Sequence, residues 1–233
     1  GMNKDKLKDL LLFKSSKEEK LVTLKEYVER AKEGQDTIYY ASGETVDKIK
    51  GLPQVESVSD KGYEILYLTE NVDEFVLQIL VEYEGKKFKN VCADNIDMGT
   101  EEEKVALKKI NDENKEMLDT MKEALKGDVQ DIKFTDRLTK HPVCLTTEGG
   151  LSIEMAKTIN NQMGANEAVK AQTVLEINKD HVIVSKLKEL FNSDKEELKK
   201  FTKILYSQAR LIEGLTIENP TEYSNWICEL LAK

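Results

Sequence analysis

Cys144 and His141 are the residues of this sequence whose types best fit catalytic chemistry. A cysteine becomes a nucleophile when a neighbouring base takes its proton, and histidine is a common base. The two residues are three positions apart, however, and residues at that spacing along a strand point to opposite faces. His181 is distant from Cys144 in the sequence and can approach it only if the fold brings the two residues together. We therefore expect a structural or incidental cysteine, and the alternative is a cysteine-dependent hydrolase or transferase that uses Cys144 and His141.

The cysteines do not form a recognisable metal site. Cys92, Cys144 and Cys228 include no close-spaced pair, and neither of the two histidines belongs to a ligand motif. We therefore expect no bound metal. An odd number of widely spaced cysteines fits reduced thiols in a cytosol better than a disulfide framework.

Two glycine-containing turns are candidates for phosphate binding, Ser42-Gly43 and Gly149-Gly150. A phosphate site needs several backbone N–H groups that converge on the anion from a glycine-rich loop. Neither turn matches a P-loop or a dinucleotide fingerprint, and glycine between a strand and a helix ordinarily serves backbone geometry. No catalytic, cofactor-binding or metal-binding residue is therefore predicted in this chain.

An apolar stripe follows the second of these turns. Leu151, Met155, Ile159 and Met163 recur at four-residue spacing, which predicts a helix with a methionine-rich edge. Methionine is pliable and polarisable, so an exposed stripe of it fits many partners. From the pattern alone, packing of the stripe against the body of the protein is favoured, and an exposed binding face is the alternative.

Two amphipathic helices are expected at the end of the chain, over residues 195–212 and 220–231. Asn219 is a candidate N-cap of the second, with Pro220 in its first turn. The apolar stripes comprise Leu198, Phe201, Ile204, Leu205, Leu211 and Ile212 in the first helix, and Tyr223, Trp226, Ile227, Leu230 and Leu231 in the second. Two antiparallel helices cannot cover both stripes by themselves. Pairing with the same helices of a second copy would give a four-helix bundle with a two-fold axis.

The residues up to 95 alternate between short strands and short helices. We expect strands over residues 37–41, 63–68 and 86–91, and helices over residues 21–31, 43–50 and 72–81. Such alternation implies right-handed crossovers on a parallel sheet. Residues 1–95 are therefore expected to form a small α/β unit of three layers.

The pattern changes at residues 93–100, which marks the expected domain boundary. A charged helix over residues 101–126 follows, then strands over 129–134, 143–147 and 173–177, and a helix over 181–191. Residues 96–233 are expected to form a mixed α/β domain that ends in the helical bundle.

The composition is that of a helix-rich globular protein, with 39% hydrophobic residues, 34% charged residues and 3 prolines. The net charge of -9 disfavours binding to nucleic-acid backbones. No apolar run approaches the roughly 20 residues that span a membrane, and the first residues do not resemble a secretory signal. We expect a cytoplasmic protein without nucleic-acid or membrane partners.

Four segments resemble, in order, signatures of the heat-shock protein 90 family in its bacterial form. They read LKEYVERAKEGQDTIYYASGE at 24–44, NVDEFVLQILVEYEGKKF at 71–88, FTDRLTKHPVCLTT at 134–147 and VLEINKDHVIV at 174–184. Lys179 departs from the family pattern, which usually has proline there. In that family the ATP-binding module comes first and the opening signature lies late in the middle domain. The resemblance therefore implies the end of the middle domain over residues 1–95 and the C-terminal dimerisation domain over residues 96–233.

The resemblance also implies a function, that of a chaperone fragment which forms a constitutive homodimer and binds unfolded or partly folded client proteins. ATP and Mg would bind the parent protein outside this chain, so the fragment should hold no cofactor and is not expected to be an enzyme. The implied client-facing positions are Leu151, Met155, Thr158, Ile159 and Phe75, of which Thr158 departs by being polar, and the resemblance favours their exposure. The implied dimer interface comprises Leu198, Phe201, Leu205, Ile212, Tyr223, Trp226, Ile227 and Leu230.

Overall fold

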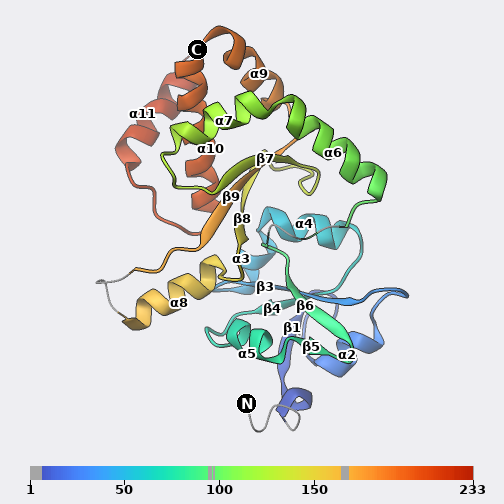
Figure 1. The fold of residues 1–233 in the computed structure, drawn as a ribbon. Helices are drawn as coiled ribbons and strands as arrows, with labels where there is room; N and C mark the ends of the chain where they lie inside the picture. Colours follow the sequence, from blue (N-terminus) through green and yellow to red (C-terminus); the bar gives the residue numbers. More distant parts are fainter. Residues whose placement is uncertain (1–6, 94–95, 97, 164–167, 233) are drawn as a thin grey trace. The chain divides into compact units, whose positions relative to one another are not determined.

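The computed structural model describes residues 7–93, 96, 98–163 and 168–232 (Figure 1). The chain folds as two compact units, residues 1–96 with 150–171 and residues 97–149 with 172–233, so it passes between them three times. This division differs in one respect from the boundary expected near residue 95. The segment 150–171, which the sequence assigns to the second domain, packs with the first unit.

The first unit is a mixed α/β structure, as expected. Its helices are η1 (Lys8–Leu10), α2 (Leu24–Glu29), α3 (Val46–Lys50), α4 (Pro53–Asp60), α5 (Asp73–Leu80) and α8 (Ile153–Met163). Its strands are β1 (Leu12–Ser15), β2 (Leu21–Thr23), β3 (Thr37–Ser42), β4 (Ile65–Leu68), β5 (Glu82–Tyr83) and β6 (Lys86–Asn90).

The six strands form one sheet in the order β2-β1-β4-β3-β6-β5. The central strand β3 pairs in parallel with β4 and with β6, which confirms the three predicted strands and their parallel pairing. The outer pairs β1–β2, β1–β4 and β5–β6 are antiparallel, so the sheet is mixed and not wholly parallel as expected. The outer strands were missed because they contain only two to four residues each.

Two helices of this unit also differ from the sequence prediction. The helix expected over residues 21–31 begins only at Leu24, because Thr23 and Glu26 form a capping box that starts the helix there. Residues 21–23 belong to β2. Helix α4 was not predicted, although Pro53 occupies its first turn and Val55 and Val58 are buried.

The second unit contains a three-stranded sheet and five helices among its described residues. Its strands are β7 (Asp131–Thr135), β8 (Val143–Glu148) and β9 (Gln172–Asn178), and its helices are α6 (Glu101–Glu113), α7 (Lys115–Ala124), α9 (Ile183–Ser193), α10 (Lys195–Ile212) and α11 (Pro220–Leu231). Strand β9 lies in the middle, parallel to β7 and antiparallel to β8. Helices α7 and α10 pack against this sheet and against each other.

The helix expected over residues 101–126 is two helices that meet at Asn114. The Asn114 side chain donates a hydrogen bond to the carbonyl oxygen of Ile110, 2.7 Å away, and its backbone leaves the helical region with φ of -109° and ψ of 12°. None of the residues of α6 is buried, whereas α7 buries Met117 and Met121. The break therefore separates a solvated helix from one that belongs to the core.

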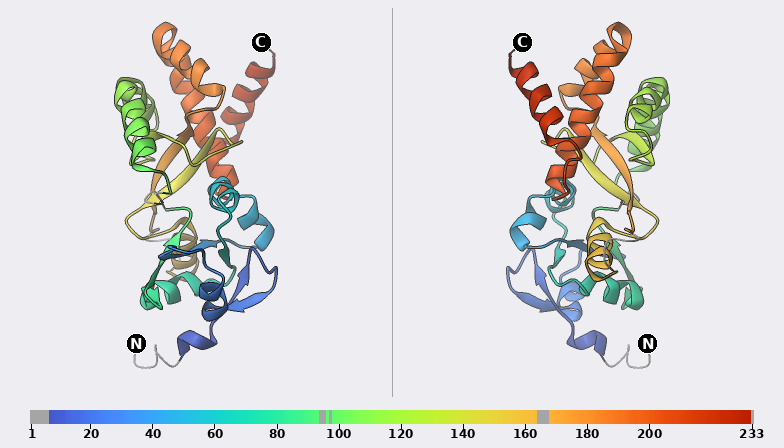
Figure 2. Two further views of the ribbon diagram at one scale, coloured as in Figure 1. Left: turned by 90° about the vertical axis from the view of Figure 1, so that its right-hand side faces the viewer. Right: turned by 90° about the vertical axis from the view of Figure 1, so that its left-hand side faces the viewer.

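Helices α10 and α11 have the bounds that the sequence predicts. Asp194 accepts hydrogen bonds from the backbone N–H groups of the first turn of α10, and Asn219 does the same for α11. The side views show that the two helices spread apart from the turn that joins them (Figure 2).

Among the described residues, no helix is both long enough and apolar enough to span a membrane.

Candidate functional site

Helix α8 carries most of the residues expected to face a client, and it packs against its own unit. The side chains of Met155 and Thr158 are only 5% and 8% exposed, whereas Leu151 and Ile159 are half-buried. The expectation of an exposed position is therefore wrong for Met155 and Thr158. The structure does not describe the side chain of Met163.

Helix α5 holds the beginning of α8 in place. The amide nitrogen of Gln78 donates a hydrogen bond to the carbonyl oxygen of Gly150, at 2.6 Å, and lies 3.1 Å from the sulfur of Met155. The hydroxyl group of Ser152 donates to the carboxylate of Glu74, at 2.6 Å. These contacts hold Met155 against α5 and explain the burial of its side chain.

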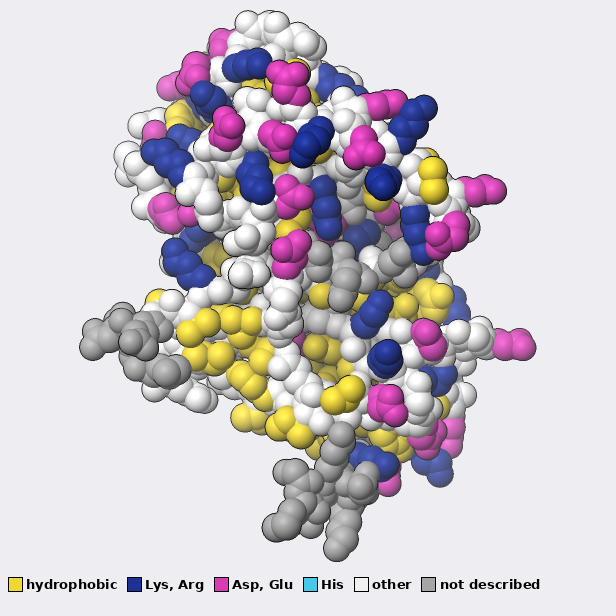
Figure 3. Space-filling view, in the orientation of Figure 1, with side chains coloured by type: hydrophobic (Ala, Val, Ile, Leu, Met, Phe, Trp, Pro, Cys, Tyr) yellow, Lys and Arg dark blue, Asp and Glu magenta, His cyan; other side chains and the backbone are white. Residues whose placement is uncertain are grey.

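Apolar side chains gather over α5 and α8 on one face of the first unit (Figure 3). Phe75 in α5 is half-buried, and its neighbours Val72 and Ile79 are 60% and 61% exposed. Val81 follows them with a φ of +68°, which is uncommon for a β-branched residue, and is 58% exposed. Exposed apolar side chains that gather on one face make that face a candidate for contact with another molecule. The structure thus brings Phe75 into the same unit as Leu151 and Ile159.

Glu74 lies beneath this surface with its carboxylate buried, and it is not among the site residues predicted from the sequence. It accepts hydrogen bonds from Ser152 at 2.6 Å, Asn90 at 2.8 Å, Ser42 at 3.0 Å and Tyr40 at 3.3 Å. Burial raises the pKa of the Glu74 carboxyl above its ordinary value, although the four donors act in the opposite direction. The four donors come from β3, β6 and the turn before α8, so local periodicity gave no signal of the cluster.

The polar residues of the first signature hold the unit together. Arg30 binds the buried carboxylate of Glu64 through two hydrogen bonds, of 3.0 Å from Nε and 2.6 Å from Nη2. The Tyr27 hydroxyl group donates to the Glu64 carbonyl oxygen at 2.7 Å and accepts from the Tyr39 backbone N–H at 3.0 Å. These residues of the signature therefore stabilise the fold of the first unit.

A similar cluster joins the last two signatures in the second unit. The buried Glu176 carboxylate accepts a hydrogen bond from Thr146 at 3.0 Å and lies 3.5 Å from both Lys133 and Arg137. Lys179, which replaces the usual proline, donates its backbone N–H to the Thr135 carbonyl oxygen at 3.1 Å. Proline has no such donor, so the departure adds a hydrogen bond to the end of β9.

The residues of the predicted dimer interface divide into two groups. Leu198 and Leu205 are 0% and 4% exposed within their own unit, so they are not available to a partner and the prediction is wrong for both. Both residues belong to α10, which packs with α7, α9 and β8 of the same unit. The remaining predicted residues are half-buried or exposed: Phe201, Ile212, Tyr223, Trp226, Ile227 and Leu230. None of the residues of α11 is buried.

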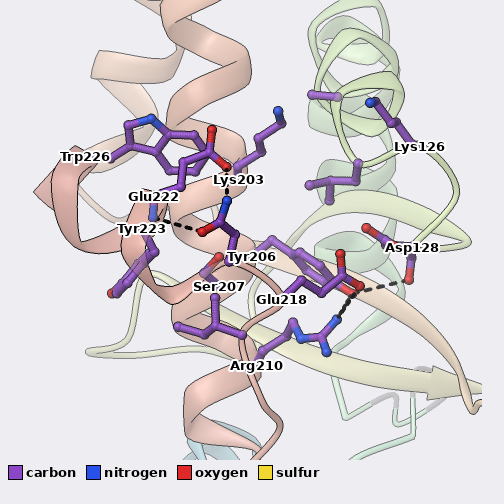
Figure 4. Close-up of a pocket in the computed structure, with 14 residues that line it drawn as sticks. Lys126, Asp128, Lys203, Tyr206, Ser207, Arg210, Glu218, Glu222, Tyr223 and Trp226 are labelled. Carbon is purple, nitrogen blue, oxygen red and sulfur yellow. Dashed lines mark hydrogen bonds and ion pairs between the residues drawn. The ribbon is translucent and has the colours of Figure 1, made fainter.

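A cavity of about 210 Å³ lies between α10, α11 and the turn after α7 (Figure 4). Lys203 lies over the ring of Trp226, with its nitrogen 5.8 Å from the ring centre. Arg210 donates a hydrogen bond to the Tyr206 hydroxyl at 3.3 Å and forms an ion pair with Glu218. Charged groups of both signs line the cavity, and this mixture selects no single class of ligand.

Cys144 does not have the surroundings of a nucleophile. Its side chain is 1% exposed in β8, and burial raises the pKa of its thiol well above the ordinary value, with a further contribution from Glu176. A nucleophilic cysteine needs the opposite change, because the thiolate is the reactive form. His181 uses Nδ1 to accept a hydrogen bond from the backbone N–H of Ile183, 3.1 Å away. A cysteine-dependent enzyme built on Cys144 and His141 is therefore unsupported.

Alkylation should rank the cysteines by exposure. In the folded protein we expect iodoacetamide to modify exposed Cys228 first and Cys144 at a rate lower by about a hundredfold or more. Mass spectrometry of tryptic peptides over time measures the rates, and the same reaction in urea supplies the unfolded control. Equal rates for Cys144 and Cys228 in the folded protein would contradict the assignment.

The metal and phosphate candidates were also compared with the structure of the described residues. The described part of the chain contains no group of three or more His, Cys, Asp or Glu side chains that could hold a metal ion. A Cβ atom on Gly43 would lie 2.8 Å from a carbon of Ile49, so the missing side chain allows close packing at this turn. Gly149 and Gly150 adopt φ values of +77° and +82°, which explains the diglycine by backbone conformation.

Comparison with known proteins gives one consistent result. A family model described as Hsp90 protein matches residues 1–233. The chain is 51% identical to Chaperone protein HtpG of Clostridium perfringens (strain 13 / Type A) over 231 residues, which is 99% of this chain and 36% of that protein. It is 50% identical to the protein of the same name from Clostridium botulinum (strain Loch Maree / Type A3), covering 99% of this chain and 37% of that protein. The chain thus spans little more than a third of the length of these relatives.

Proposed function

The chain belongs to the Hsp90 family, and from that premise we propose that it is the part of a chaperone that joins two protomers and binds unfolded or partly folded client proteins. Its relatives carry the name Chaperone protein HtpG. The whole protein would be an ATP-driven chaperone of the cytoplasm, with ATP and Mg bound outside this chain. The three-layer arrangement of the first unit and a helical bundle between two copies are parts of the same proposal.

The exposure of α11 is the observation that supports dimerisation most strongly. This helix has no buried residue, yet it carries five large apolar or aromatic side chains, Tyr223, Trp226, Ile227, Leu230 and Leu231. Helix α10 adds Leu211, which is 49% exposed, and Ile212, which is 36% exposed. A stable interface usually buries about 1,200–2,000 Å² in total, and burial of apolar surface contributes about 25 cal/mol per Å². A second copy of the same two helices would cover this surface across a two-fold axis.

The apolar face over α5 and α8 supports the binding of clients. Unfolded polypeptides share exposed apolar side chains and no common sequence, so a surface that binds them must be apolar and adaptable. Phe75, Leu151 and Ile159 are half-buried and retain part of their surface for such contacts. Met155 can join them only if α8 moves.

Replacement of Leu151 and Ile159 by Asn should weaken the binding of an unfolded polypeptide about tenfold, because two apolar contacts are lost. Fluorescence anisotropy with labelled, reduced and carboxymethylated α-lactalbumin measures the affinity. Exposed Asn161 and Gln162 lie on α8 beside Ile159, so their replacement by Ala is the matched control. Unchanged affinity in the Asn variant, with unchanged circular dichroism, would remove α8 from the client surface.

A further inference from the structure

Two residues of α5 hold the first turn of α8, and they lie one helical turn apart. Glu74 and Gln78 have the i, i+4 spacing that places side chains on the same face of a helix. Glu74 accepts a hydrogen bond from the Ser152 hydroxyl group at 2.6 Å, and Gln78 donates to the Gly150 carbonyl oxygen at 2.6 Å. Both contacts join residues more than 70 positions apart in the sequence. One face of α5 thus recognises the start of α8.

The hydroxyl group of Ser152 has two roles at once. It accepts a hydrogen bond from the Met155 backbone N–H at 3.0 Å, as an N-cap does, and donates its single proton to Glu74. The bond to Glu74 is charge-assisted, which makes it one of the stronger polar contacts of the helix. The start of α8 and its attachment to α5 therefore depend on the same atom.

If α8 detached from α5, the buried Glu74 carboxylate would keep most of its hydrogen-bond donors. Tyr40, Ser42 and Asn90 would still donate to its carboxylate, because all three belong to the sheet. On the other side of the contact, the left-handed Gly150 precedes Ser152 and permits backbone conformations closed to other residues. The attachment can therefore break without leaving an unpaired buried charge.

We propose that Glu74, Gln78 and Ser152 form a latch that keeps α8 docked on the first unit and controls how much of its apolar face is available to a client. The docked state buries Met155 and Thr158, and also Ile153 and Ala156 of the same helix. Release of the latch exposes this face and enlarges the apolar surface over α5. The consequence for clients rests on the proposed function, whereas the latch itself does not.

Hydrogen–deuterium exchange of the full 233-residue chain tests the latch. Ser152→Asp keeps a good N-cap but removes the donor and places a second carboxylate beside Glu74. We expect the amides of α8 to exchange at least about tenfold faster than in the wild type, with β3 and β9 unchanged. Ser152→Asn is the matched control, because Asn also caps a helix and its amide group can still donate to Glu74. It should exchange at a rate close to that of the wild type.

Gln78→Ala provides a second variant on an exposed residue, so the test survives if Ser152→Asp fails to fold. It should also accelerate exchange in α8 alone. The latch would be overturned if the α8 amides of Gln78→Ala exchanged at the wild-type rate. Where Ser152→Asp folds, its α8 amides must show the same wild-type rate for this outcome. In the same variants, affinity for carboxymethylated α-lactalbumin should rise. Faster exchange without tighter binding would keep the latch and reject the client role of α8.

Discussion

Replacement of Arg30 by Met should lower the free energy of unfolding of the first unit by about 3 kcal/mol, near the lower end of the range for breaking a buried ion pair. Glu64 is 3% exposed, and Arg30 supplies two of the hydrogen bonds to its carboxylate. The Ser15 hydroxyl group, which donates to the same carboxylate at 2.6 Å, would remain. The expected loss of stability lies near the lower end of that range because the Arg30 side chain is 25% exposed, so water can partly replace it.

Urea unfolding followed by far-ultraviolet circular dichroism measures this loss. Trp226, the single tryptophan, lies in the second unit, so its fluorescence follows that unit separately. Lys50→Met is a suitable control, because Lys50 pairs with Glu19 in an exposed contact of the same unit that contributes about 1 kcal/mol or less. If Arg30→Met lowers the free energy of unfolding no more than Lys50→Met does, the ion pair does not stabilise the unit in the way we infer.

Joint replacement of Trp226 and Leu230 by Ala should raise the dissociation constant of the proposed dimer by about a hundredfold or more. Large aromatic side chains near the centre of an interface commonly contribute more than 1 kcal/mol each, and each 1.4 kcal/mol is a factor of ten. Both residues are half-buried in the single chain and lie on a helix without a buried residue. Light scattering after size exclusion at micromolar concentration should show a shift from dimer to monomer.

Ser224 and Asn225 provide the matched control for this experiment, because both are exposed polar residues of the same helix. Their replacement by Ala should leave the dimer intact. Trp226 also lies under Lys203 at the edge of the cavity, so circular dichroism must show that α11 remains helical in the test variant. A monomeric wild type would refute the dimer, and an unchanged mass of the test variant would exclude these two residues from the interface.

The elements that the sequence predicts best are those with strong local signals. Helices α10 and α11 begin at the expected residues because Asp194 and Asn219 cap them, and β3 is recognisable from its buried apolar run. The break at Asn114 was missed because the apolar spacing continues through it, and only the side-chain bond to Ile110 reveals the interruption. Short outer strands such as β5, with two residues, have too little pattern to detect.

The candidate site was predictable only in part, for a different reason. Helical periodicity identified the stripe of α8 and the stripes of α10 and α11, but it cannot say which partner covers a stripe. Leu198 and Leu205 lie on the side of α10 that faces its own unit, and Met155 meets a side chain 77 positions earlier in the chain. Glu74 was missed because its four donors converge only in three dimensions.

The discontinuity of the first unit has a consequence for its assembly during translation. A ribosome synthesises the strands of the six-stranded sheet by residue 90, but the helix that completes the unit ends at Met163. The nascent chain must therefore make α6, α7, β7 and β8 before α8 can dock on α5. At about 5–20 residues per second, this leaves an interval of several seconds in which α5 lacks its partner helix. The apolar surface over α5 therefore stays uncovered by α8 until the ribosome has synthesised the segment 150–171.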